Sequence, residues 1–193
     1  MARRKYEFKP DKTGSGFLGK LYITRRQRLA LLRWALYALV MLALSLVQDV
    51  ILSRVSFYGA TTDLVPAGIL LLTMLLDPEE GAVFSLVAST FFYFSGSAPG
   101  PYAIALLTGL GTVANIFRHG YLRVGFPTTF FCAAFSVMAY ELLVYVTGSF
   151  LQLTLASRFV VFCVTGGLSV AVLPILYPAF LSIGKIGGET WKE

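Results

Sequence analysis

The sequence predicts an all-α polytopic membrane protein, built as one bundle of six transmembrane helices. Six apolar stretches fill residues 29–183 of the 193-residue chain and leave only short polar segments between them. A bilayer core is about 30 Å thick, and about 20 helical residues cross it with every backbone group paired inside the segment. Only 13% of the residues are charged, against about 25% in a soluble domain. We therefore expect one transmembrane domain at 29–183, a basic tail at 1–28 and a short tail at 184–193.

The first two predicted helices, at 29–51 and 63–76, differ in length. The first follows a polar, basic segment without a small-residue cleavage site, so we expect an uncleaved signal anchor. Near its outer end, Gln48 and Asp49 are expected to meet interfacial water. The second rises only about 21 Å at 1.5 Å per residue, which is too short to cross a full bilayer. We expect residues 60–62 to extend the helix, the membrane to thin there, or neighbouring helices to enclose it.

The third and fourth predicted helices, at 78–94 and 101–117, each carry a stripe of small residues. Asp77 is expected to be the N-cap of the third helix, with Pro78 as its first residue and Glu80 as the N3 capping partner. Because hydrophobic drive between helices is absent in lipid, stripes of small residues hold bundles together by close approach. We expect internal packing here, and the alternative is a face for another protein's helix. The stripes comprise Gly81, Ser85 and Ser89 in the third helix and Gly111 and Asn115 in the fourth.

The fifth predicted helix, at 127–147, contains an acidic residue, Glu141, near the bilayer midplane. A carboxyl at this depth costs a few kcal/mol on insertion scales, so it is expected to face the bundle interior. We expect it to form a structural hydrogen bond with Asn115 or with a Ser or Thr of a neighbouring helix. A proton or substrate role is the alternative. The sixth helix, at 159–183, returns the chain to the side on which it began.

The distribution of positive charge places both predicted termini in the cytoplasm. Lys and Arg near helix ends mark the cytoplasmic side of a membrane protein. The N-terminal tail is rich in them, and six crossings bring the loop with Arg118 and Arg123 and the C-terminal tail to the same side. Arg54 and Arg158 then lie outside, and Arg33 is expected to snorkel to the cytoplasmic surface. Topology and attraction to anionic membrane lipids thus explain the net charge of +6 without nucleic acid.

The sequence lacks the common signatures of catalysis and metal binding. It contains no Gly-rich phosphate loop, no H-E-x-x-H motif and no paired-cysteine motif, and its sole histidine, His119, has no obvious metal partner. Glu141 alone is a weak basis for acid–base chemistry. We therefore expect no enzymatic activity and no cofactor.

Residues 46–123 resemble the rod shape-determining protein MreD family in the order of their features. The matching segments are LVQ at 46–48, TDL at 62–64, a tight turn leading to Gly81, and SGSAPGPYA at 95–103. The family usually has Pro-Asp-Leu where this chain has TDL. The motif positions single out Asp63, Gly96 and Gly100 as residues that the resemblance places at a partner-binding site.

The resemblance implies a non-enzymatic scaffold subunit of the bacterial cell-elongation machinery in the inner membrane, with a role in rod shape and peptidoglycan synthesis. Such a protein would bind a bitopic MreC-like partner. It would link cytoplasmic MreB-type filaments to the periplasmic cell-wall synthases, a SEDS glycosyltransferase and a class B penicillin-binding protein. The basic tail would lie near the filaments or on membrane lipids.

A substrate-binding subunit of an energy-coupling-factor vitamin transporter is the alternative. These subunits are also small and six-helical, with both termini in the cytoplasm. They enclose a polar pocket near the outer side, and their first helix typically has an Ala-x-x-x-Ala contact motif. The alanines of helix 29–51 have no such spacing, which favours the scaffold.

Overall fold

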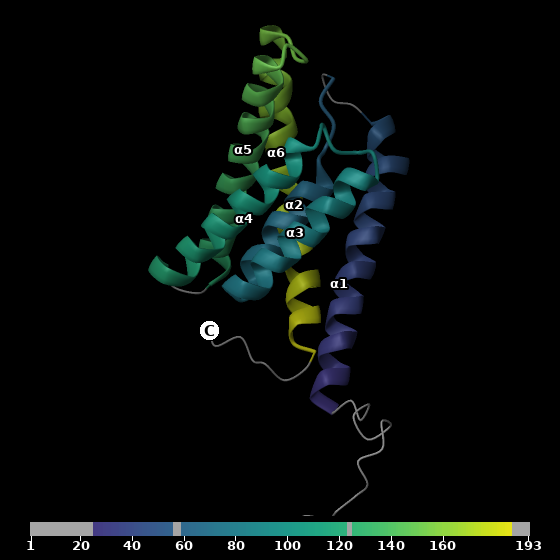
Figure 1. The fold of residues 1–193 in the computed structure, drawn as a ribbon, viewed down its shortest axis with the longest axis vertical. Coiled ribbons are helices and arrows are strands. Elements are labelled where there is room, and N and C mark those ends of the chain that lie inside the picture. Colours follow the sequence, from purple (N-terminus) through teal and green to yellow (C-terminus); the bar gives the residue numbers. More distant parts are fainter. Residues whose placement is uncertain (1–24, 56–58, 123–124, 187–193) are drawn as a thin grey trace, which may run out of the picture.

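The computed structural model describes residues 25–55, 59–122 and 125–186, which form six α-helices and two short 3-10 helices (Figure 1). The α-helices are α1 (Arg25–Val50), α2 (Leu64–Leu75), α3 (Pro78–Phe94), α4 (Tyr102–Tyr121), α5 (Phe126–Phe150) and α6 (Phe159–Gly184). The 3-10 helix η2 (Leu52–Arg54) follows α1, and η3 (Ala156–Arg158) precedes α6. The predicted all-helical class is confirmed for this part of the chain.

Each predicted apolar stretch corresponds to one helix, and the bounds differ most at α1 and α4. α1 begins at Arg25, so the end of the predicted basic tail is helical. α4 continues to Tyr121, so Arg118 and His119 lie in its last turn and not in a loop. Basic side chains are favourable there because the C-terminal end of a helix carries partial negative charge. Residues 1–24 and 187–193 of the two predicted tails lie outside the described residues.

Successive α-helices run in alternating directions along the molecule (Figure 1). The beginning of α1 and the end of α6 lie at one end, which we call the basal end. The turn between α2 and α3 and the end of α4 point toward the same side. The end of α1, the beginning of α2 and the turn between α3 and α4 face the opposite, distal end (Figure 1).

α2 is the central helix, and the other five α-helices surround it. It contacts each of α1, α3, α4, α5 and α6, and all twelve of its residues are buried. Its length of about 18 Å at 1.5 Å per residue is shorter than a bilayer core. Enclosure by neighbouring helices, one of the three expectations for this segment, is therefore what the structure shows, whereas residues 60–62 do not extend the helix. A helix that is apolar on all sides is buried either in a protein core or in lipid, and here protein surrounds it.

The molecule has apolar side chains on its outer surface and polar side chains in its interior. Leu39 of α1 and Phe135 of α5 are 64% and 76% exposed, whereas Asn115, Arg118 and Glu141 are buried. Large exposed apolar surfaces are rare on soluble monomers. Among the described residues, three helices are long and apolar enough to cross a membrane, namely α1 with η2, α5 and α6. Both observations indicate a membrane protein.

Candidate functional site

Two acidic side chains from distant parts of the chain meet inside the bundle. Asp63 directly precedes α2, Glu141 lies in α5, and their carboxyl groups are hydrogen-bonded to each other. Glu141 is only 3% exposed. An ionised carboxylate can only accept hydrogen bonds, so this contact requires a proton on at least one of the two acids. Proton sharing lets two acids remain side by side, because two buried negative charges would repel each other strongly.

The beginning of α2 positions the Asp63 carboxyl group for this contact. Asp63 occupies the N-cap position, but its side chain does not cap the helix. Its backbone N–H donates to Ser169 Oγ of α6 at 2.9 Å, and the N–H of Val65 donates to Gln48 Oε1 of α1 at 2.8 Å. Two N–H groups at the start of the helix are thus satisfied by neighbouring helices. The Asp63 carboxyl is therefore free to pair with Glu141.

This arrangement corrects two expectations about polar residues. Gln48 is buried and bonds α2, where interfacial water was expected. The acidic partner of Glu141 is Asp63, and Asn115, one of the expected partners, lies elsewhere. Asn115 contacts the end of α2, whereas Asp63 and Glu141 lie at its beginning. The length of α2 therefore separates the two polar groups.

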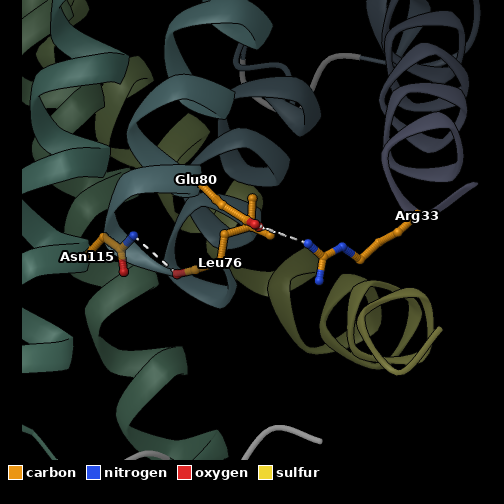
Figure 2. Close-up of polar contacts among 4 residues, drawn as sticks. All are labelled: Arg33, Leu76, Glu80 and Asn115. Atoms are coloured by element: carbon orange, nitrogen blue, oxygen red, sulfur yellow. Dashed lines mark hydrogen bonds and ion pairs between the residues drawn. The ribbon is translucent and has the colours of Figure 1, made fainter. Parts of the chain in front are cut away.

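Asn115 belongs to a second polar cluster at the basal end (Figure 2). Its side-chain N–H donates to the Leu76 carbonyl at 3.3 Å, which satisfies a backbone acceptor at the end of α2. The guanidinium of Arg118, one helical turn further on, donates to the Met74 carbonyl. Arg118 is only 2% exposed, although the sequence analysis placed it in a basic loop. The spacing of Gly111, Asn115 and Arg118 along one helical face could have revealed its burial.

Arg33 and Glu80 form the other half of the basal cluster (Figure 2). Arg33 Nη2 lies 3.0 Å from Glu80 Oε2 and 3.3 Å from Oε1. Glu80 therefore binds α1 and does not cap α3 as expected, and α3 has no side-chain cap at its start. Likewise, Arg33 is buried in the bundle and does not extend to the surface.

The small-residue stripe of α3 faces α2 and α4. Gly81 lies so close to both that an added Cβ would be 2.5 Å from Asn115 Nδ2 and 2.6 Å from the Thr73 carbonyl oxygen. Ser85 is fully buried beside Gly111, and the Ser89 hydroxyl lies 3.2 Å from that of Thr108 on α4. The stripe is thus occupied by helices of the same chain. It leaves no free surface for another protein's helix.

Gly96 and Gly100 lie in the turn between α3 and α4, at the distal end. Gly96 has φ of +78°, a left-handed conformation that glycine adopts without steric cost. An added Cβ on Gly100 would lie 2.6 Å from the Tyr102 ring. The Ser97 hydroxyl donates to Asp49 Oδ1 at 2.7 Å and so ties this turn to the end of α1. Both glycines therefore shape the distal turn.

A cavity of about 240 Å³ between α5 and α6 was not evident in the sequence. Glu141 forms part of its wall, and the rest of the wall is mainly aromatic and aliphatic. The cavity depends on how two apolar helices pack against each other, a property that neither composition nor spacing reveals. Within the described residues, no group of three or more His, Cys, Asp and Glu side chains is arranged to hold a metal ion.

The apolar surface and the internally paired polar groups define an α-helical membrane protein. Its main buried polar groups are the Asp63–Glu141 pair and the basal cluster. The sequence matches no protein family model, and neither curated proteins nor solved structures give a significant match.

Proposed function

We propose that the protein is a non-enzymatic scaffold subunit of the bacterial cell-elongation machinery, with six membrane crossings and both termini in the cytoplasm of the inner membrane. Its partner would be an MreC-like bitopic protein, and through it the cell-wall synthases and MreB-type filaments. The proposal rests on the resemblance of residues 46–123 to the MreD family. The alternating helix directions and the short turns between helices are compatible with six crossings (Figure 1).

One observation supports a scaffold in particular: most of the buried polar groups bind the protein's own helices. Arg33, Asn115 and Arg118 each bond a side chain or carbonyl of a neighbouring helix. These contacts fix the relative positions of α1, α2, α3 and α4. Such rigid internal packing suits a subunit that acts by presenting its outer surface to a partner in the membrane.

The exposed face of α1 is the surface that best suits a partner's single transmembrane helix. Leu32, Leu39 and Leu46 repeat at seven-residue intervals, with Ala35 and Leu42 between them, which is the spacing of a helix–helix seam. All five residues are exposed, while Tyr37, Met41 and Leu44 on the opposite face are buried. Among the described α-helices, α1 makes its principal contacts only with α2 and α6, so no described helix covers this seam.

Co-purification tests the proposed assembly. The tagged protein is extracted from native membranes in mild detergent, and its partners are identified by mass spectrometry. Recovery of an MreC-like protein or a cell-wall synthase supports the elongation scaffold. Recovery of a coupling membrane subunit with a pair of ATPases contradicts it and supports the vitamin-transporter alternative.

Disulfide cross-linking in membranes tests the binding face. Cysteine replaces Leu42, which is 62% exposed on α1, and a series of cysteines is placed along the partner's transmembrane helix. We expect cross-links at partner positions three or four residues apart, as in a helical seam. Native Cys163, exposed on α6, is the internal control and should not cross-link. Cross-links through Cys163 alone would move the interface to α6.

The vitamin-transporter alternative is favoured by one feature, the polar pair near the beginning of α2. A transporter subunit would hold its substrate near the outer side, which is where Asp63 and Ser169 meet in the proposed topology. Vitamin binding to the purified protein would establish this alternative. If no vitamin binds, the Asp63–Glu141 pair is available for a different ligand.

A further inference from the structure

The cavity between α5 and α6 opens on the outer surface of the bundle. Two of its wall residues, Phe135 and Phe159, are 76% and 44% exposed. A second, shallower hollow of about 540 Å³ shares Phe135 and Met138 with it and extends along the same two helices. Since α5 and α6 are long and apolar enough to cross a membrane, both hollows would face lipid. A ligand could then enter sideways from the bilayer.

The size of the cavity suits a small apolar molecule. An engineered protein cavity of about 150 Å³ is large enough to bind benzene, and this cavity measures about 240 Å³. Three aromatic rings gather at it. The ring of Tyr145 lies with its centroid 5.3 Å from that of Phe159 and 5.5 Å from that of Phe162. Aromatic faces attract cations as well as apolar groups.

Glu141 gives this otherwise apolar cavity an acceptor. It forms part of the wall and is only 3% exposed. Its Oε1 has no hydrogen-bond partner among the described residues. A buried unpaired carboxyl oxygen is costly, so such an atom in a native structure requires an explanation. A carboxyl oxygen has the capacity to accept such a hydrogen bond from a ligand.

The two buried arginines among the described residues, which could act as counter-ions, are bound at the basal end. Arg33 pairs with Glu80, and Arg118 donates to the Met74 carbonyl at the end of α2. Asp63 and its partner Glu141 of α5 lie at the opposite end of α2, near its beginning. When the pair shares a single proton, it carries one negative charge that these two arginines do not neutralise. A cation with an apolar body would supply the missing charge and the missing donor together.

We propose that the α5–α6 cavity is an intramembrane binding site for an alkyl or aralkyl ammonium group. Its apolar body occupies the aromatic-lined space, and its N–H donates to Glu141 Oε1. The Asp63 carboxyl, through its shared proton, positions Glu141 for this contact. Binding of this kind does not depend on the elongation machinery, because it uses only residues of α5, α6 and the beginning of α2.

Protection from a hydrophobic carbodiimide tests the site. The purified full-length protein in lipid nanodiscs is treated with dicyclohexylcarbodiimide. The O–H of a protonated carboxyl adds across one C=N bond of this reagent and forms an O-acylisourea. Peptide mass mapping then measures the labelling rate of Glu141. We expect hexylamine to slow labelling about 100-fold at 100 times its Kd, because only the empty site reacts. Hexanol, of similar size but uncharged, is expected to protect far less.

Two variants at the same helix locate the ligand. Ala139→Leu fills the cavity and is expected to abolish protection by hexylamine. Ala134→Leu makes the same change in the shallower hollow and is expected to preserve it. Equal protection by hexanol and hexylamine, or protection that survives Ala139→Leu, would overturn the proposal.

A second measurement keeps the proposal testable if Glu141 fails to label. Hexylamine is expected to raise the Tm of the wild-type protein in nanodiscs, and this shift is expected to vanish in Glu141→Gln. The absence of any shift in the wild type contradicts ammonium binding.

The ammonium group could come from a free amine in the bilayer or from a lysine of a partner's helix. Labelling in native membranes separates the two. Protection that disappears on exchange into synthetic lipid, while partner chains remain bound, assigns a free amine. Protection that disappears only with removal of a partner chain assigns a lysine side chain. Full labelling of Glu141 in native membranes shows an empty site and rules out an endogenous ammonium ligand.

Discussion

Arg33 and Glu80 are 47 residues apart in the sequence and form a two-oxygen ion pair that joins α1 to α3. Arg33 Nη2 lies 3.0 Å from Glu80 Oε2, and the side chains are 11% and 40% exposed. The arginine is therefore the more deeply buried partner. Loss of the glutamate charge would remove one ionic partner from a largely desolvated guanidinium, and breaking a buried ion pair on one side is destabilising.

Glu80→Gln is expected to lower the free energy of unfolding by about 1 kcal/mol, since a charge-assisted hydrogen bond becomes a weaker neutral one. Glu79→Gln, at the exposed neighbouring position, is the matched control and should change stability by less than about 0.5 kcal/mol. Denaturant titration in mixed micelles measures both. Equal effects of the two variants would mean that the ion pair contributes nothing beyond a surface charge.

Gly81→Ala is expected to destabilise the bundle by about 1–3 kcal/mol, the usual cost of overpacking. Its added Cβ would meet the Thr73 carbonyl oxygen at 2.6 Å, and a backbone atom cannot move aside as a side chain can. Gly109→Ala in α4 is the control, because nothing lies within 4 Å of its added Cβ. There, replacement of a helical glycine is expected to stabilise by about 0.5–1 kcal/mol.

Thermal unfolding of both glycine variants in nanodiscs gives the comparison. Opposite signs of the Tm change are expected. A decrease of similar size in both variants would show that α3 does not approach α2 closely at Gly81.

The sequence predicted the helices well because apolar runs and helix-starting residues are local signals. The interval 78–94 coincides with α3, whose start is set by Pro78. The small-residue spacing of Gly81, Ser85 and Ser89 correctly indicated a packing face. It did not indicate the occupant of that face, because the choice between an internal helix and a partner depends on the tertiary arrangement.

The polar pairs could not be predicted from the sequence, because each joins residues from separate helices. Glu141 was correctly expected to lie inside, from the cost of a carboxyl in lipid. Its partner Asp63 was singled out only by the MreD resemblance, and nothing local links the two positions. Similarly, Glu80 had a plausible local role as a capping residue. Glu80 instead pairs with the buried Arg33, because the loss of one partner from a buried ion pair costs more than the loss of a cap.

Gly96→Ala is expected to destabilise the protein by about 1–2 kcal/mol, because the alanine Cβ is disfavoured at φ of +78°. Open space surrounds this position, with nothing within 4 Å of an added Cβ, so backbone conformation alone sets the cost. Gly96→Asn is the control, because asparagine tolerates the left-handed region better than alanine. Urea or detergent unfolding is expected to rank Asn above Ala. The reverse order would indicate that the turn adopts another conformation in the membrane.

A double-mutant cycle measures the interaction between Asp63 and Glu141. Glu141→Leu removes one carboxyl and leaves the other buried without its partner, so a loss of about 1–3 kcal/mol is expected. Asp63→Ala has the corresponding effect on Glu141. In the double variant neither acid remains to be desolvated, and its loss is expected to be smaller than the sum of the single losses by about 1 kcal/mol or more. Glu141→Gln, which can still donate to Asp63, should stay close to the wild type. All variants are compared by unfolding in the same nanodiscs, and strictly additive losses would show that the two carboxyl groups do not interact.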